Sequence, residues 1–276
     1  MKRRVLAAVL ATGILAVGAL VDAGQGNIRM TVHNMSNIQT FAGRHFYSDT
    51  VEQVCVFCHT PHNAQPSVPL WNKVNPTQAF RMYTSSQSLS AAAKAVTAPG
   101  PESLLCLSCH DGRTAINVLH NSNVGTPLGN DKEVSIAGKA ATDDGLGLPG
   151  VQMHIDMGGM GGTYRANIGK AGEATAAQAY AGNNLMDDHP ISFSYSVAQG
   201  QKPTALKPIE TPKAQGFRFY GSNNRMECST CHDPHVDYGM DYDGTPTLSP
   251  TGNTKLKPFL VRDNEGSAMC LACHNK

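Results

Sequence analysis

The sequence predicts a fold of mostly irregular backbone with short α-helices and little β-sheet, and three observations lead to this expectation. Aromatic residues make up only 6% of the chain, whereas there are 27 glycines and 16 prolines among 276 residues. Such a composition offers little material for a core made of side chains alone. Helix signals are few, and all eight cysteines belong to one short motif that is repeated four times. A group attached at that motif would have to supply the missing interior.

The motif is C-x-x-C-H, the attachment signature of a c-type haem. Two intervening residues put both sulfurs on one face of a helical turn, where they add to the vinyl groups of the porphyrin. The next residue directs an imidazole at the iron. The expected attachment residues are Cys55, Cys58, Cys106, Cys109, Cys228, Cys231, Cys270 and Cys273. The expected proximal iron ligands are His59, His110, His232 and His274. We therefore expect four covalently bound haem c groups as cofactors.

Cysteines in this spacing have other common uses. Two C-x-x-C pairs can hold a structural zinc ion, and eight cysteines in an exported chain can form four disulfides. A disulfide within C-x-x-C is typical of a thioredoxin-like redox motif in a βαβ setting, a pattern not seen in this sequence. None of these uses explains why histidine follows the second cysteine in all four copies, so haem is the preferred interpretation.

Four large, flat, apolar macrocycles would act as the interior of such a protein. The expected fold class is therefore mostly irregular coil with short α-helices at the motifs, wrapped around four stacked c-type haems. A chain that depends on its cofactor in this way should stay largely unfolded when the haems fail to attach, as small metal-dependent domains do.

The N-terminus has the pattern of a secretory signal peptide. Basic residues at Lys2–Arg4 precede an apolar run at 5–21, and Val21–Ala23 is a plausible small-residue cleavage site. An uncleaved anchor helix is the alternative, but a run of this length with two glycines is at the lower edge of a membrane span. We expect residues 1–23 to be removed and no lipid anchor, because no cysteine precedes Cys55. The expected location is extracellular or at the cell surface, with the periplasm as the alternative.

The four motifs fall into two pairs that resemble each other. The first motif of each pair extends to C-H-x-P-H, at residues 58–62 and 231–235, and the second motif of each pair reads C-L-x-C-H. This internal repeat predicts two related di-haem modules, at residues 24–142 and 173–276. Residues 143–172 between them are rich in glycine, and we expect a linker or a loop that lies close to a haem.

Outside the motifs, helix signals occur at two places. Residues 86–96 begin with serine, continue with good helix formers and are followed by Pro99. Residues 173–181 are a weaker case. Residues 203–212 have a proline at each end and a third, Pro208, between them, and this pattern predicts extended coil.

A low-spin electron-transfer haem needs a sixth iron ligand, commonly histidine or methionine. Methionines in a haem-packed chain are more typical of packing than of ligation. His62 and His235, in the two C-H-x-P-H copies, are the best distal candidates. Each lies three residues after a proximal histidine, so it cannot reach the far side of its own haem but can bind an adjacent one. A solvated histidine after a turn is the alternative.

Two further histidines complete the predicted distal set. His189 follows Asp187 and Asp188, whose carboxylates could accept its second ring N–H and fix its tautomer. A capping or loop role is the alternative for His189. His33 is the fourth choice. The reserve candidates are His45, His120 and His154.

Together these residues resemble the multihaem cytochromes of the doubled C-x-x-C-H group. The resemblance covers most of the mature chain and is carried by residues 33–36, 54–64, 69–72, 106–112, 188–192 and the last two motifs. Four haems, a cleaved signal and no lipid anchor are similar to the OmcE type of secreted tetrahaem cytochrome. This resemblance implies extracellular filaments of stacked haems, with other copies of the chain as partners. It also implies that one iron can take its distal histidine from a neighbouring subunit, with His33, His45 or His154 as candidates.

These patterns predict electron transfer without substrate chemistry, and so not an enzyme. Closely packed six-coordinate haems pass single electrons, and two histidine ligands give lower potentials than histidine with methionine. Partner cytochromes or extracellular acceptors would complete the path. The formal charge of +1 points neither to nucleic acid nor to an anionic membrane surface.

Two other functions stay open. A soluble periplasmic electron shuttle would have the same haem sites without assembly into filaments. A multihaem reductase of a small oxyanion would need an open iron position, usually marked by an irregular motif or a missing ligand. All four motifs are regular here and spare histidines are present, so the reductase is the less favoured function.

Overall fold

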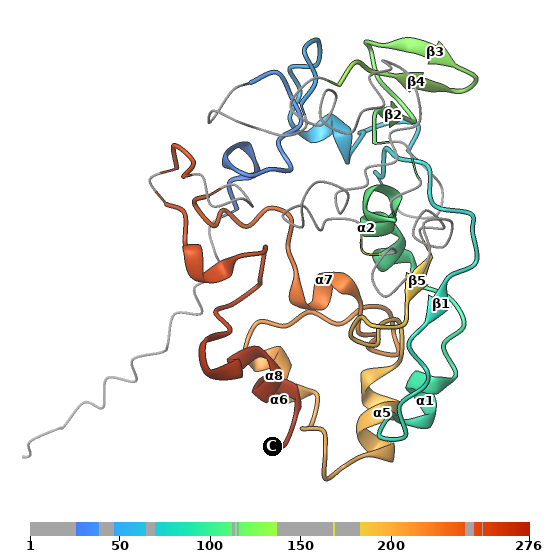
Figure 1. Cartoon of the computed structure of the whole chain (residues 1–276), viewed down its shortest axis with the longest axis vertical. Helices are drawn as coiled ribbons and strands as arrows, with labels where there is room; N and C mark the ends of the chain where they lie inside the picture. The colour runs from blue at the N-terminus through green and yellow to red at the C-terminus, as the bar shows by residue number, and fades with distance from the viewer. Residues whose placement is uncertain are drawn as a thin grey trace, which may run out of the picture.

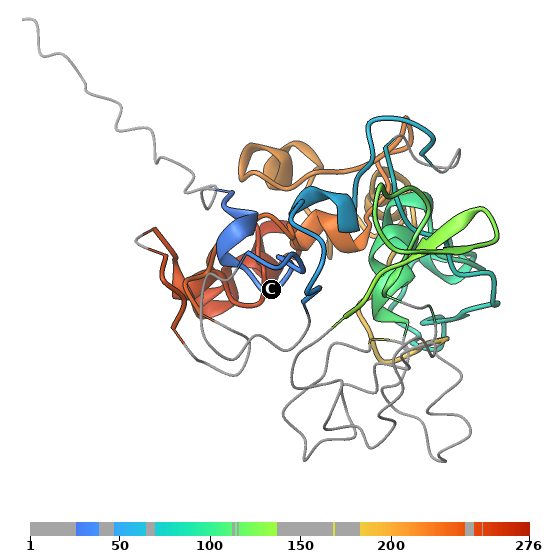
Figure 2. The same cartoon turned by 90° about the horizontal axis from the view of Figure 1, so that it is seen from above.

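The computed structural model describes residues 26–38, 47–64, 70–111, 114, 116–136, 168, 183–240, 246–249 and 251–276. In this part of the chain, short helices and strands are joined by long irregular segments (Figures 1 and 2). The predicted signal peptide and the predicted helix at 173–181 lie outside the described residues. The predicted glycine-rich linker does so too, apart from residue 168.

The helices are short, and several begin at a recognisable cap. The α-helices are α1 (Ala91–Lys94), α2 (Pro101–His110), α5 (Tyr195–Gln201), α6 (Glu210–Ala214), α7 (Cys228–Cys231) and α8 (Ala268–Cys273). The 3-10 turns are η1 (Ile28–Met30), η2 (Cys55–Phe57), η4 (Thr254–Leu256) and η5 (Glu265–Ser267). Ser90 and Ser194 accept backbone N–H groups from the first turns of α1 and α5, as N-capping residues do.

Two small sheets are described. Strand β1 (Arg81–Met82) pairs in parallel with β5 (Asn184–Leu185), with Arg81 opposite Asn184. Strands β2 (Val118–Leu119), β3 (Thr126–Leu128) and β4 (Asp131–Glu133) form an antiparallel sheet in the order β2-β4-β3. This second sheet lies at one end of the long axis, at the top of Figure 1.

Segments that are far apart in the sequence pack against each other. Helix α1 contacts α5, α2 contacts α7, and β1 pairs with β5. Gly26, near the start of the described chain, forms a bridge with Val236. Residues 26–136 and 183–276 therefore share several contacts, while the proposed division into two di-haem modules stays a prediction.

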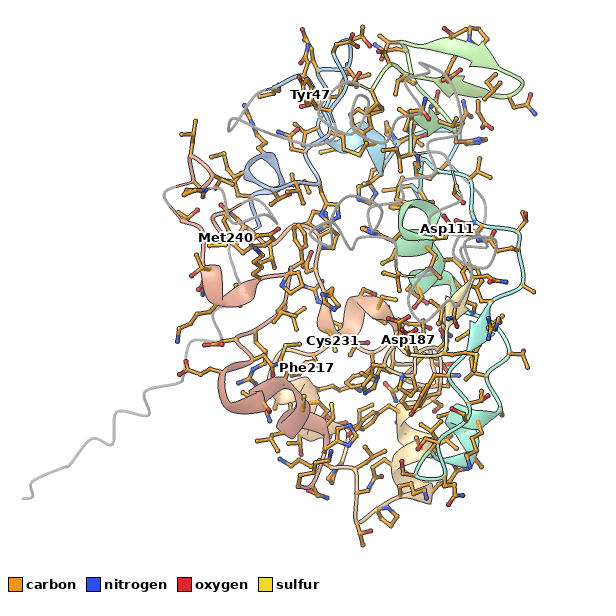
Figure 3. The ribbon with its side chains drawn as sticks, viewed as in Figure 1. Tyr47, Asp111, Asp187, Phe217, Cys231 and Met240 are labelled. Atoms are coloured by element: carbon orange, nitrogen blue, oxygen red, sulfur yellow. The ribbon has the colours of Figure 1, made fainter. Side chains whose placement is uncertain are left out.

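The buried apolar side chains of the described residues form five separate clusters instead of one continuous core. Three of these clusters include or border motif cysteines. Cys58 packs against the cluster of Val51 and Phe57. Cys231 packs beside Phe217 near the middle of the molecule (Figure 3), and Cys273 belongs to the cluster around Tyr195.

Two local predictions differ from the structure. The helix expected at 86–96 is only α1, because Ser86 bonds to the side chain and backbone of Ser88 in a turn and Ser90 caps the helix that follows. Residues 203–212 are not extended throughout, since the chain turns after Lys202 and helix α6 begins before the last proline. Pro212 lies in the first turn of α6, where a missing N–H is tolerated.

No helix among the described residues is long and apolar enough to cross a membrane.

Candidate haem-binding sites

Each of the four motifs lies on a helical turn. The first turn is η2, the second is the last part of α2, the third is α7 and the fourth is the end of α8. The backbone N–H groups of His59, His232 and His274 donate to the carbonyl of the first cysteine of their own motif, at 2.7, 3.1 and 2.9 Å. This bond puts each imidazole one helical turn beyond that cysteine.

The eight motif cysteines are all described, and none of them forms a disulfide. Burial, and then the neighbouring Cys109, raise the pKa of Cys58 to about 12. Burial, and then the neighbouring Cys273, raise the pKa of Cys231 to about 12. At neutral pH both groups are therefore neutral thiols, and a free metal ion binds the thiolate form.

Cys106 and Cys228 lie side by side, because their side chains share a hydrogen bond. This bond raises the pKa of Cys106 and lowers the pKa of Cys228. The second motif thus touches the third through Cys106, and it approaches the first through Cys109. The third approaches the fourth through Cys231 and Cys273. Consecutive motifs are therefore neighbours in space as well as in sequence.

A buried carboxylate holds the second and third motifs together. The Glu227 side chain, which is 0% exposed, accepts hydrogen bonds from Ser103 Oγ at 2.6 Å, Ser192 Oγ at 2.7 Å and Arg225 Nε at 2.9 Å. Arg225 also pairs with Glu102 of α2 at 2.7 Å. Because Glu227 is the N-cap of α7, its bond to Ser103 joins α7 directly to α2.

Three of the four motif histidines lie opposite a histidine from elsewhere in the chain. The pairs are His59 with His235, His110 with His33, and His274 with His189, with ring centroids 6.3, 6.0 and 6.4 Å apart. Metal–nitrogen bonds of about 2 Å on two sides of one metal ion give a separation of about 6 Å between imidazole centroids. The spacing of these pairs therefore fits two axial ligands of one iron.

Hydrogen bonds at the other ring nitrogen orient several of these imidazoles. Nδ1 of His235 bonds to Asp233 Oδ1 at 2.7 Å, Nδ1 of His189 to the Pro190 carbonyl at 2.8 Å, and Nδ1 of His232 to the Pro258 carbonyl at 2.9 Å. An N–H that donates from Nδ1 leaves the lone pair on Nε2, which is the form that binds a metal.

The environment also favours neutral imidazoles at three further positions. Burial, followed by the nearby His110, lowers the pKa of His33 to about 3, although the Pro234 carbonyl opposes this shift. Burial, followed by its partner His235, lowers the pKa of His59, and burial followed by His189 lowers the pKa of His274. A neutral ring is the form that a metal requires.

The remaining predicted ligands are placed differently. His62 is exposed, and no described histidine faces either His62 or His232 at a comparable spacing. Nδ1 of His120 bonds to Asp131 Oδ1 at 2.9 Å, an arrangement like that of His235 with Asp233. His45 and His154 lie outside the described residues. Asp187 and Asp188 do not hold His189 through its Nδ1, whose partner is the Pro190 carbonyl.

Two charged residues at the motifs carry no signal in the sequence. Lys73 and Glu227 are 1% exposed, although charged side chains are rarely buried so fully. Lys73 follows Trp71 and Asn72 in a stretch without helix or strand periodicity. Glu227 directly precedes Cys228, but glutamate is not among the preferred N-capping residues.

No group of three or more histidine, cysteine, aspartate or glutamate side chains is placed to hold a metal ion within the described ranges. No protein-family model matches the chain, and comparison with curated proteins gives no match.

Proposed function

We propose that this chain is a tetrahaem c-type cytochrome that carries electrons without substrate chemistry, and that copies of it assemble into an extracellular conductive filament. When bound, each haem supplies a one-electron redox centre. The eight motif cysteines would attach the haems, and the motif histidines would bind their irons. The rest of the chain supplies the opposite ligands and fixes the spacing.

The observation that carries the proposal is the set of three imidazole pairs. In each pair a motif histidine faces a histidine that the motif itself does not contain, at the spacing expected for two ligands of one iron. An iron held by two imidazoles has no open position for a substrate. This arrangement favours electron transfer over reduction of a small oxyanion.

The cysteine neighbours support passage of electrons along the chain of motifs. Cys58 is near Cys109, Cys106 is bonded to Cys228, and Cys231 is near Cys273. Haems attached at adjacent sulfurs would have adjacent edges, so the first, second, third and fourth haems would follow one another in space.

The iron at His232 would take its second ligand from His62, His45 or His154. Of these three histidines, His62 lies within the described residues. It is exposed, so a second copy of the chain can reach it. The resemblance to filament-forming tetrahaem cytochromes implies one ligand of this kind. A His62→Ala variant tests the assignment, since it would leave one iron per chain open to carbon monoxide and stop filament growth.

Mass analysis of the mature chain, combined with spectroscopy, tests the proposal as a whole. We expect the added mass of four haems and, in the assembled filament, a low-spin spectrum for all four irons and no stoichiometric binding of carbon monoxide. A mature chain without added macrocycles would refute haem attachment. An iron of the assembled wild-type filament that binds carbon monoxide stoichiometrically would favour the reductase instead.

Electron microscopy of the secreted protein tests the filament. Filaments with a regular repeat are the expected result. Monodisperse particles alone, in protein with four haems, would instead support the soluble periplasmic shuttle.

A further inference from the structure

Lys73 is a lysine enclosed between the segments that follow the first and second motifs. It is 1% exposed, and its Nζ donates to the carbonyl oxygens of Ile116 at 2.7 Å and Val118 at 2.9 Å. These carbonyls take the place of water around the ammonium group, which has three donors to satisfy. Burial lowers the pKa of Lys73, and the nearby Cys109, Cys58, Asp111 and Asp131 oppose this shift. A charge held by two carbonyls can stay inside the protein, where solvent screens it little.

The same lysine lies beside two haem-attachment positions. Its neighbour Asn72 donates its backbone N–H to the Cys58 carbonyl at 2.9 Å, and the Asn72 side chain donates to the Val56 carbonyl at 2.6 Å. The ammonium group acts electrostatically on the sulfurs of both Cys58 and Cys109. The first and second motifs therefore share one buried cation.

Two carboxylates also act on Lys73. Asp111, labelled in Figure 3, is buried and accepts hydrogen bonds from Gln78 and from Thr114. Asp131 lies nearer the surface, where it bonds to His120. These anions reduce the field of the ammonium group at the two motifs, but removal of the cation would still make that field more negative.

We propose that Lys73 is a redox-tuning residue whose buried positive charge raises the reduction potentials of the haems attached at the first and second motifs. Oxidation of a haem iron adds one positive charge, and a nearby cation in a medium of low dielectric constant disfavours that change. The proposal rests on the haem binding proposed above. Its consequence is that electrons are drawn toward the half of the molecule that carries the first two motifs.

Spectropotentiometric titration of the four-haem protein tests this role. In Lys73→Gln, which keeps polar donors but loses the charge, we expect part of the titration curve to move to lower potential. The expected change is about tenfold in the redox equilibrium constant, or about 59 mV for one electron. Lys73→Arg should keep the wild-type curve, because it keeps the charge.

A surface lysine provides the matched control. Lys255 is exposed and pairs with Asp263 and Glu265, so Lys255→Gln loses the same charge where water screens it. The shift in potential of Lys255→Gln from the wild type should be only a small fraction of the shift of Lys73→Gln. If Lys73→Gln carries four haems and titrates like the wild type, the tuning role is refuted while the proposed function stands. A wild-type chain without haem would instead refute the proposed function.

A second variant keeps the test decisive if Lys73→Gln does not mature. Asp131→Asn removes a negative charge near Lys73 and the first two motifs. We expect this variant to move the same part of the titration curve to higher potential. An unchanged curve in this variant contradicts the proposal. A second outcome also contradicts the proposal: every variant without the Lys73 charge loses its haems, while Lys73→Arg matures with four haems. The positive charge would then be needed for folding and not for the potentials.

Discussion

His235 faces His59 across a spacing that suits one iron, and Asp233 holds it in that position. The Asp233 carboxylate accepts both the Nδ1 proton and the backbone N–H of His235, at 2.7 and 3.0 Å. The bond to Asp233 raises the pKa of His235, and the bond from His235 lowers the pKa of Asp233. One carboxylate two residues away thus fixes both the tautomer and the ring orientation of a proposed ligand.

Removal of this ligand should open one iron. In His235→Ala, we expect one haem of the four to become high-spin and to bind one carbon monoxide per chain, because its second imidazole is gone. Ferric electron paramagnetic resonance and carbon monoxide difference spectra measure both effects. Lys255→Gln is the control, since Lys255 is exposed and pairs with Asp263 and Glu265, and this change should leave all four irons low-spin. An unchanged spectrum of His235→Ala would exclude His235 as a ligand.

Tyr195 gives a pH-dependent prediction. Its hydroxyl donates to the carbonyls of Lys207 at 2.8 Å and Cys273 at 3.2 Å, and burial, followed by Cys273, raises its pKa. Because the pKa of Tyr195 is raised in the folded state, the protonated hydroxyl stabilises the fold fully at neutral pH. This stabilisation is lost as the pH rises above about 10. Tyr195→Phe should cost about 1 kcal/mol at neutral pH.

Denaturant titrations at neutral and alkaline pH measure this difference. The free energy of unfolding of the wild type should fall more steeply with pH than that of Tyr195→Phe above about pH 10. If the free energies of unfolding of the two proteins fall in parallel with pH, the pKa of Tyr195 is not raised in the folded state.

At the scale of elements, the α2–α7 junction leaves no room for an added side chain at one position. A Cβ at Gly100, the N-cap of α2, would collide with the Glu227 carboxylate that bonds to Ser103 and Ser192. Gly200, inside α5, has no atom within 4 Å of the same position. The two glycines therefore form a matched pair.

Alanine substitutions at these glycines should have opposite effects. Gly100→Ala should destabilise the protein by about 1–3 kcal/mol, because the buried Glu227 has to move. Gly200→Ala should stabilise it by up to about 1 kcal/mol, because alanine is the better helix former. Thermal denaturation of both variants with four haems attached measures the difference. Equal effects would mean that Glu227 is not packed against α2.

Local patterns predict the motif turns, because C-x-x-C-H has a geometric requirement that the sequence states directly. They predict less between the motifs. Ser90 caps α1 four residues after the expected start, since Ser86 has an equally good turn available. Helix α5 had no convincing signal, because Gly200 lowers its helix propensity and its N-cap Ser194 lacks an acidic or glutamine residue at the third position.

At the proposed haem sites too, local sequence patterns predict only part of the arrangement. The spacing of His235 predicts that it binds an adjacent haem, but only the three-dimensional arrangement pairs it with His59. The buried charges of Lys73 and Glu227 could not be predicted, because their partners are backbone carbonyls and hydroxyls that distant segments bring together. Sequence patterns indicate which residues can bind, and tertiary packing decides which of them meet.

At the scale of the whole molecule, the apolar side chains described here do not form one core. The five clusters are small, and cysteines of the first, third and fourth motifs lie within them or at their edges. Since these small clusters do not make one core, we expect the chain to be largely unfolded when all four motifs carry Cys→Ser substitutions. Far-ultraviolet circular dichroism and protease sensitivity measure this outcome. A chain without haem that resists protease and unfolds cooperatively would contradict it.

The bridge between Gly26 and Val236 and the pairing of His59 with His235 can form only after the C-terminal part of the chain has been made. Well over half of the chain separates the two members of each contact. During synthesis, the leading part would therefore wait, exposed to proteases, until the trailing part arrived to close over it. Proteolysis would act during that delay, so nonsense mutations late in the gene should abolish the accumulation of the whole product instead of leaving a stable front half.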